Sequence, residues 1–323
     1  MKEITIGKNQ CGQRLDKFLS KYMKEASKGF LYKMLRKKNI KLNGKKAEGR
    51  EMLSEGDVVT LYLSEETLSK FMGQDKRESG RLDGNKVVLS ILYENEHIAL
   101  IDKPAGMLSQ RAGSGDMSLV EYFRSYVGST EEGFSPGICN RLDRNTSGIV
   151  IGGKSLLGLQ TISELLRERR IEKYYIAVVK GSIKKRDTAE GWLIKDPRAN
   201  KVRISNRQTP DSFYIKTGYE PLGTDGMYTL LKVRLFTGKP HQIRSYLASI
   251  SHPVAGDAKY GGRIPGSPVH RQLLHAWELR FPKMKEPFSD LSGAVFRAGL
   301  PGDFYKDVSI RKLIQQYMKE EGR

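Results

Sequence analysis

Between residues 64 and 86 the sequence changes character, and this change limits what the whole chain can fold into. The segment is polar, rich in charge and contains three glycines, with only scattered apolar residues. Such a composition is typical of a flexible linker, here one with room for a single short helical stretch. We therefore predict two folded units, residues 12–63 and residues 87–323, joined by this linker.

Positive charge is the strongest functional signal in the composition. The chain has 56 Lys and Arg against 37 Asp and Glu, a formal net charge of +19. Such a surplus attracts polyanions, most commonly nucleic acid, although a protein can also be basic without binding one. The excess is concentrated, because from Lys21 to Arg50 there are 11 basic residues and only two acidic ones. We predict that the first unit binds nucleic acid.

The same sequence excludes several other classes of protein. Its 323 residues contain no uncharged apolar stretch near the roughly 20 residues of a membrane helix. The start, Met1 to Thr5, has no apolar signal region, so secretion is not expected. Two cysteines cannot form a disulfide framework, and neither has the spacing of metal ligands. We predict a reduced, cytoplasmic protein with no membrane contact, no metal and no evident obligate protein partner.

The first unit is predicted to form two helices followed by a short β ribbon. One helix face begins at Leu15, and Ser27 is the predicted N-cap of the second helix. Asn43-Gly44 marks a tight turn before an apolar strand that starts at Val58. This order resembles the S-four-type RNA-binding domain, named for a small-subunit ribosomal protein; two ordinary amphipathic helices with solvated lysines are the alternative. The residues expected to contact RNA are Lys28, Arg36, Lys37, Lys38 and Lys41.

The second unit alternates short strands and helices irregularly. Because its strands are short and its glycines dispersed, an α+β domain on a largely antiparallel sheet is favoured over a doubly wound one. Strands are predicted over residues 87–93, 98–101, 148–152, 174–179 and 228–236, and helices over residues 155–169 and 241–250.

The stretch from Gly148 to Ser155 formally matches the phosphate-loop pattern G-x-x-x-x-G-K-[ST] of NTPases. A phosphate loop needs an apolar strand before its first glycine and flexible residues inside, so that backbone N–H groups can turn inward. Here the preceding run is polar and the interior is Ile-Val-Ile. We therefore predict a buried strand that leads into a helix, with the NTPase kept as an alternative that requires nucleotide binding.

Directly before this strand lies a carboxylate between two arginines. Asp143 is flanked by Arg141 and Arg144, and a short polar turn follows it. Opposite charges nearby favour the ionised form, so Asp143 is expected to be a carboxylate at neutral pH. Taken alone, the cluster is also consistent with a structural ion pair.

The residues Arg141-Leu142-Asp143 and Thr146-Ser147-Gly148 resemble the R-L-D-x-x-T-S-G signature of the RluA-like family of RNA pseudouridine synthases. Further segments of the family follow in the right order along residues 87–282, and an S-four-type domain often precedes this catalytic domain. These segments are Lys173-Tyr174-Tyr175-Ile176-Ala177, Thr237-Gly238-Lys239-Pro240-His241-Gln242-Ile243-Arg244, Gly256-Asp257, Tyr260-Gly261, Leu274-His275-Ala276 and Phe281-Pro282.

Two positions depart from the family's pattern. Asn140 stands where the family often has histidine, and Lys239 stands where arginine is usual. Neither change removes the aspartate, the tyrosine or the arginine that the family uses. We expect activity to be kept and substrate contacts near Asn140 to differ.

The resemblance implies an α+β pseudouridine synthase domain that isomerises uridine in RNA and uses no cofactor and no metal. Asp143 would be the catalytic aspartate, with Arg244 beside it to keep it ionised and oriented. Tyr175 would stack on the target base, and its hydroxyl would serve proton transfer at carbon 5; a plain buried sheet tyrosine is the alternative. Arg141 would fill the space of a flipped nucleotide or hold a phosphate, unless it pairs with an acidic group. Attack by Asp143 on the sugar, attack on the base and proton abstraction at ribose carbon 2 all remain open.

The resemblance also indicates the partner. Family members with this pair of domains act mostly on large-subunit ribosomal RNA, so we expect that RNA as the substrate, with transfer RNA left open. The hypothesis from a different class is a non-catalytic RNA-binding or ribosome assembly factor on the same scaffold. Replacement of Asp143 or Arg244 would favour it, and both residues are present.

Overall fold

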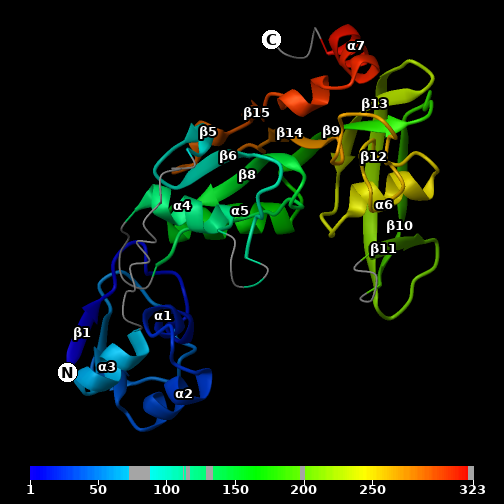
Figure 1. The fold of residues 1–323 in the computed structure, drawn as a ribbon. Coiled ribbons are helices and arrows are strands. Elements are labelled where there is room, and N and C mark those ends of the chain that lie inside the picture. The colour runs from blue at the N-terminus through cyan, green and yellow to red at the C-terminus, as the bar shows by residue number, and fades with distance from the viewer. Residues whose placement is uncertain (73–87, 112, 114–116, 129–133, 197–200, 319–323) are drawn as a thin grey trace.

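The computed structural model describes residues 1–72, 88–111, 113, 117–128, 134–196 and 201–318 (Figure 1). It contains two separate sheets, one of four strands near the N-terminus and one of 11 strands in the rest of the chain. Helices pack beside both sheets, and the large sheet is mostly antiparallel. The predicted α+β class is confirmed.

Helices α1 (Leu15–Tyr22) and α2 (Lys28–Arg36) follow the predicted apolar spacing, and their apolar faces share one buried cluster. The Ser27 hydroxyl accepts a hydrogen bond from the Phe30 N–H at 3.2 Å and so caps α2 as predicted. At the predicted turn, Asn43 and Gly44 have φ angles of 49° and 71°, the left-handed conformation of a tight hairpin. The sheet has the order β1-β4-β2-β3, with β1 (Lys2–Thr5), β2 (Ile40–Leu42), β3 (Lys45–Lys46) and β4 (Val58–Leu61).

One short helix, α3 (Glu65–Met72), lies in the range for which the sequence predicts a linker. Its Leu68 is buried in the same cluster as α1 and α2, and the Phe71 ring lies 4.3 Å from the Phe30 ring, measured between centroids. The predicted start at residue 12 also leaves out β1, which pairs with β4. We therefore propose that the N-terminal unit comprises residues 1–72. The rest of the predicted linker, residues 73–86, lies outside the described residues.

The large sheet has the order β11-β10-β12-β13-β9-β14-β8-β6-β5, with β15 beside β14 and β7 beside β8. Among the described pairs, β8 and β14 run parallel and the others antiparallel. The strands are β5 (Ser90–Glu94), β6 (Ile98–Lys103), β7 (Gly137–Ile138), β8 (Ser147–Gly153), β9 (Glu172–Lys180), β10 (Asp187–Asp196), β11 (Lys201–Ser205), β12 (Ser212–Thr224), β13 (Tyr228–Leu235), β14 (Leu274–Arg280) and β15 (Val295–Arg297).

Three apolar clusters fasten helices to this sheet. Residues of α4 (Leu119–Val127) and α6 (Gln242–Ser249) share the first cluster with the centre of the sheet. Helix α5 (Leu156–Arg167) packs on β6 and β8, and α7 (Val308–Tyr317) packs on β9 and β13. Two short 3₁₀ turns, η1 (Ser289–Leu291) and η2 (Gly302–Tyr305), lie in the C-terminal segment.

The phosphate-loop match is a strand and not a loop, as the sequence predicts. All of β8 is buried, and Ser155 caps α5 directly after it. The lysine of the pattern, Lys154, donates to Glu94 and to the Asn95 carbonyl. The Lys154 ammonium is therefore already bound within the fold and does not face a nucleotide-binding loop, so the structure does not support the NTPase alternative. No helix among the described residues is long and apolar enough to cross a membrane.

Gly148 explains how β8 and β14 can run side by side at the centre. Its φ is +108°, and a Cβ atom there would lie 2.2 Å from the Ala276 carbonyl oxygen. Any other residue would therefore clash with the backbone of β14. This close approach holds the start of β8, and with it the preceding loop that carries Asp143, against the middle of the sheet.

Candidate active site

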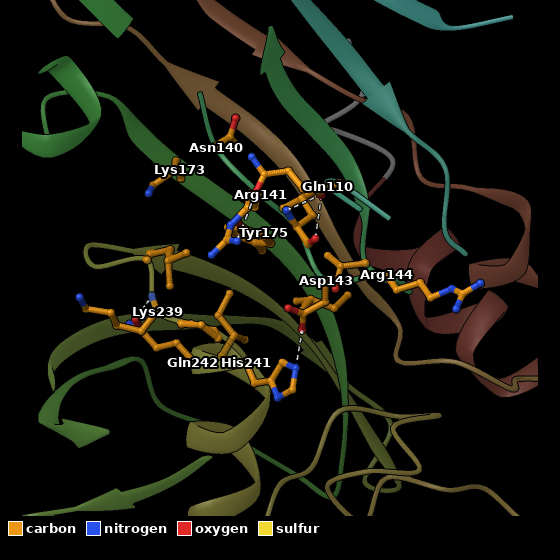
Figure 2. Close-up of a pocket in the computed structure, with 18 of the residues that line it drawn as sticks. Gln110, Asn140, Arg141, Asp143, Arg144, Lys173, Tyr175, Lys239, His241 and Gln242 are labelled. Atoms are coloured by element: carbon orange, nitrogen blue, oxygen red, sulfur yellow. Dashed lines mark hydrogen bonds and ion pairs between the residues drawn. The ribbon is translucent and has the colours of Figure 1, made fainter. Parts of the chain in front are cut away.

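A cavity of about 740 Å³ opens where the loop before β8, strand β9 and the start of α6 meet. Figure 2 shows the side chains that line it, among them Asp143, Tyr175, Arg141 and His241. These residues come from segments separated by up to about a hundred positions in the chain. The fold thus brings together the three residues that the sequence predicts as catalytic, because Arg244 lines the same cavity.

Arg244 lies between two carboxylates. Its Nη1 donates to Asp143 Oδ2 at 2.7 Å, while its Nε and Nη2 donate to the two oxygens of Asp257 at 2.6 and 2.9 Å. Burial alone would lower the pKa of Arg244, but the two aspartates outweigh this and raise it. The guanidinium is therefore a permanent charge whose forked bonds to Asp257 fix its plane, and that plane fixes the Asp143 carboxylate.

Asp257 is the buried anchor of this arrangement. Its side chain is 1% exposed, and its Oδ1 also accepts from the backbone N–H groups of Lys259 and Tyr260 at 3.0 and 3.3 Å. The preceding Gly256 has a φ of +81°, and a Cβ there would lie 2.0 Å from the Arg271 carbonyl oxygen. The sequence indicates the Gly256-Asp257 pair as a family segment, but it does not predict this role of Asp257.

His241 also lies near the Asp143 oxygen that Arg244 binds. It stands before α6 with a φ of 55°, and its Nε2 lies 4.0 Å from Asp143 Oδ2 (Figure 2). Its Nδ1 shares a hydrogen bond of 2.9 Å with the Tyr260 hydroxyl, which itself accepts from the Val202 N–H at 3.1 Å. Burial lowers the pKa of His241 more than Asp143 raises it. A neutral ring that accepts from Tyr260 through Nδ1 carries its proton on Nε2, toward Asp143.

Tyr175 lies at the centre of β9 and its ring lines the cavity. The side chain is 7% exposed, and Ala276 of β14 and Val233 of β13 flank it in the sheet. Burial, and to a lesser extent the charge of Asp143, raises the pKa of the Tyr175 hydroxyl well above its usual value. The residue therefore offers a rigid ring and a neutral hydroxyl at any working pH.

Hydrogen bonds from two basic side chains, Lys103 and Arg271, hold the loop that carries Asp143. The ammonium of the fully buried Lys103 donates to the carbonyls of Pro104, Met107 and Arg144. Arg271, which pairs with Asp303, donates to the Asn145 carbonyl at 2.9 Å. Each of these bonds ends on the main chain, so the loop is held whatever its exposed side chains do. None of these anchors was found from the sequence.

The two arginines beside Asp143 in the sequence do not hold its carboxylate. Arg141 is exposed and donates to Gln110 Oε1 at 3.3 Å, and the Arg144 Nε donates to the Gly106 carbonyl at 3.0 Å. Asn140 turns its amide to the backbone, where Oδ1 accepts from the Ile151 N–H at 2.8 Å. Arg141 thus keeps an exposed guanidinium at the cavity, whereas the amide of Asn140 serves the fold.

The predicted RNA contacts of the first unit lie on its surface. Four of them are exposed and one is half-buried, with the Lys41 ammonium 5.0 Å from the centre of the Tyr62 ring. Within the described residues, no group of three or more His, Cys, Asp or Glu side chains is placed to hold a metal ion. The exposed residues are Lys28, Arg36, Lys37 and Lys38.

Comparisons with known proteins give matches in both units of the chain. A family described as RNA pseudouridylate synthase matches residues 97–249, and the S4 domain family matches residues 13–59. A large-subunit pseudouridine synthase C from Yersinia pestis is 30% identical over 86% of this chain and 87% of its own. An uncharacterised RNA pseudouridine synthase from Aquifex aeolicus is 31% identical, over 81% of this chain and 80% of its own. The solved human RNA pseudouridylate synthase domain containing 4 shares the fold, with a TM-score of 0.56 and 20% identity over 69% of this chain and 92% of that one.

Proposed function

The chain belongs to the RNA pseudouridine synthases, and we propose that it isomerises specific uridines of large-subunit ribosomal RNA through the single carboxylate of Asp143. The observation that carries the catalytic assignment is the pairing of Asp143 with the buried Arg244 at the cavity. The ribosomal substrate is supported by relatives named large-subunit pseudouridine synthase C and D. A cytoplasmic site of action follows from that substrate.

The chemistry needs only one reactive carboxylate. In pseudouridine formation the bond from uracil N1 to ribose C1′ breaks, a bond from C5 to C1′ forms, the C5 proton leaves and N1 gains a proton. No water enters and no electrons are exchanged, unlike glycoside hydrolysis, which typically uses two working carboxylates. Asp257 is the second carboxylate nearby, but it is buried and both its oxygens bind Arg244. Of these two carboxylates, Asp143 is therefore the one available to react.

A uridine inside a stem must leave its stack to reach Asp143, at a cost of roughly a few kcal/mol. Tyr175 provides a buried ring beside Asp143 on which the flipped base can stack. Its neutral hydroxyl stands ready for the proton transfer at carbon 5. Arg141, exposed at the cavity, is placed to enter the space that the flipped nucleotide leaves.

The S4 domain supplies a second RNA contact on the same chain. Each phosphate that its exposed lysines and arginines neutralise adds affinity without regard to sequence. Because the two sites are joined, binding at one raises the effective RNA concentration at the other. The N-terminal unit thus acts as a tether, while the cavity selects and converts the uridine.

Two experiments test this function. Pseudouridines are mapped in RNA from cells with and without the gene, and the proposal expects sites in large-subunit ribosomal RNA to disappear. The purified Asp143→Asn protein should then convert those sites at least about 10³-fold more slowly, with RNA affinity within about threefold of wild type, because only a charge is removed. Lost sites confined to transfer RNA would refute the ribosomal substrate. Turnover by Asp143→Asn at the wild-type rate would remove Asp143 from the reaction.

A further inference from the structure

Lys173 is a cation at the cavity for which the fold provides no counter-charge. It lies on β9 two residues before Tyr175 and lines the cavity with it. Of the other positive side chains there, Arg244 pairs with two aspartates and Arg167 with Glu164, whereas Arg141 and Arg144 donate to neutral oxygens. Lys239 lies over the Phe213 ring at 4.7 Å. The Lys173 ammonium makes no hydrogen bond or ion pair with another of the residues that the structure describes, although the backbone of Lys173 pairs with β14 in the sheet.

The surroundings of Lys173 make its isolation costly. Burial, and then the positive charge of Arg169, lowers the pKa of the Lys173 ammonium. A partly desolvated cation with no acceptor destabilises the protein, and cations in such positions are usually paired. An anion brought by a ligand would relieve that cost, so the side chain is set to gain more from binding an anion than an exposed lysine does.

The geometry says where this anion would lie. In a strand, residues two apart point to the same face and their Cα atoms lie about 6.6 Å from each other. The Lys173 stem therefore reaches along the nucleotide whose base stacks on Tyr175. Gly238, which lines the same cavity, lies close to the ammonium: a Cβ added there would meet Lys173 Nζ at 3.5 Å, an ordinary contact distance.

Two more cations line the same cavity. In Figure 2, Lys173 and Lys239 lie on the side away from Arg144, and Arg141 lies between Lys173 and Asp143. Positive charges around a stacking ring fit a nucleic-acid backbone that passes the site while one base enters it. Among the three, Lys173 is the one that burial shields from salt and water.

We propose that Lys173 binds a backbone phosphate of the RNA strand next to the flipped uridine, and so fixes which nucleotide reaches Asp143. This inference rests on the proposed function only in requiring an RNA substrate; it does not depend on that RNA being ribosomal. Lys173 holds the substrate and takes no part in bond making, so its loss weakens binding far more than it slows the reaction at saturation.

The test uses the full-length protein and the shortest RNA fragment that wild type modifies, taken from whichever RNA the cellular mapping identifies. Single-turnover rates are measured against protein concentration for Lys173→Gln, Lys173→Arg and Lys185→Gln. Lys185 is exposed between β9 and β10 and serves as a matched loss of one charge. We expect half-saturation to rise about tenfold in Lys173→Gln, the maximal rate to stay within about threefold, and Lys173→Arg to recover most of the affinity.

A second measurement identifies the phosphate. Single phosphates within three nucleotides of the target uridine are replaced, one at a time, by neutral methylphosphonate. Wild type should lose about tenfold in affinity at one position, and Lys173→Gln should lose nothing more there, because the same contact is already gone.

The outcomes separate the possibilities. Equal half-saturation in Lys173→Gln and Lys185→Gln would overturn the inference, as would a methylphosphonate position that weakens both proteins alike. If Lys173→Gln does not fold, the scan on wild type still decides, because tolerance of every neutral linkage would leave no phosphate for Lys173 to bind. Modification of transfer RNA alone would overturn the ribosomal assignment and leave this test intact.

Discussion

The N-terminal unit and the active-site cavity both gather positive charge, but they hold it in opposite ways. Arg36, Lys37 and Lys38 stand exposed at the end of α2. Arg244 is buried; two of its three bonds end on Asp257, which backbone N–H groups hold in turn, and the third holds Asp143. The first group is free to meet any polyanion, whereas the second is already committed to one geometry.

From this difference we expect the exposed cations to set RNA affinity and the buried ones to set the rate of the reaction. Exposed cations give up bound counterions when they meet phosphates, so their contribution depends strongly on salt and weakly on position. A buried ion pair is screened little, and removing one partner leaves an uncompensated charge. Changes in the N-terminal unit should therefore act on RNA binding, and changes around Arg244 should act on turnover and folding.

After Asp143→Asn itself, the largest effect is expected from Asp257→Asn, the change that tests the buried half of this comparison. Asn keeps the shape but removes the charge and one acceptor of the Arg244 fork. We expect the free energy of unfolding to fall by about 3 kcal/mol. The maximal rate should fall about 100-fold, because Arg244 no longer holds Asp143 in place. Urea unfolding and single-turnover rates at saturating RNA measure both.

The control for Asp257→Asn is a carboxylate that pairs with a cation at the surface. Glu190 accepts from Lys216 at 2.7 Å, with half of the glutamate side chain exposed. Glu190→Gln should cost less than about 1 kcal/mol and leave the rate unchanged. If Asp257→Asn behaved like Glu190→Gln, the fork would not be what orients Asp143.

The site shows what a sequence can and cannot reveal. Asp143, Tyr175 and Arg244 were found because short motifs carry them, and the structure brings all three to one cavity. The local charge pattern indicated that Arg141 and Arg144 keep Asp143 ionised, whereas the contact in the structure is Arg244, 101 residues away, which only the family resemblance had placed beside it. Such pairings depend on how strands and helices meet, which local patterns do not contain.

The fold shows the same distinction between what local patterns predict and what they do not. Buried, strongly patterned elements such as β8 and α5 were predicted from apolar periodicity, as was the Ser27 cap. Strands β10 and β11 were not predicted, because many of their residues are exposed and their polar and apolar residues do not alternate clearly. Helix α7 was not predicted either, although Ile310, Leu313 and Ile314 have the i, i+3, i+4 apolar spacing of the face that packs on β9 and β13.

The exposed half of the comparison is tested by replacing Arg36, Lys37 and Lys38 together with alanine. We expect RNA affinity at physiological salt to fall about tenfold, and the slope of log affinity against log salt to flatten by about two units. Stability and the rate at saturating RNA should not change, because none of the three side chains packs in the core. Filter binding at several salt concentrations measures the slope.

A matched triple change shows whether position matters. Lys184, Lys185 and Arg186 form an equally exposed basic run in the second unit, between β9 and β10. Replacing them with alanine removes the same charge, but it should cost less affinity if the N-terminal unit is the tether. Equal losses would mean that net charge alone binds RNA. Unchanged affinity with a lost maximal rate in the Arg36, Lys37 and Lys38 variant would mean that the unit helps to build the active site.

The smallest expected effect is a loss of stability at acidic pH. It is expected in the second unit and not in the N-terminal unit. All five histidines lie in the second unit. One of them, His275, is fully buried beneath the Asp143 loop, where its Nδ1 shares a hydrogen bond of 2.9 Å with the Ser147 hydroxyl. Burial lowers the pKa of His275 to about 4. The folded protein therefore keeps this ring neutral at pH values where the unfolded chain binds a proton.

The sign of the pH effect follows from that difference. A histidine whose pKa is lowered by folding contributes its full stability above the unfolded pKa of roughly 6.5 and loses it as the pH falls toward 4. From pH 7 to pH 5.5 the loss should be about 1 kcal/mol for the second unit, with no matching loss in residues 1–72, which contain no histidine. Hydrogen exchange at the two pH values, corrected for intrinsic rates, reports each unit separately. His275→Asn should lower stability at pH 7 but flatten this dependence, whereas the exposed His270→Asn should leave it unchanged. A dependence that survives His275→Asn in full would assign the acid sensitivity to another group.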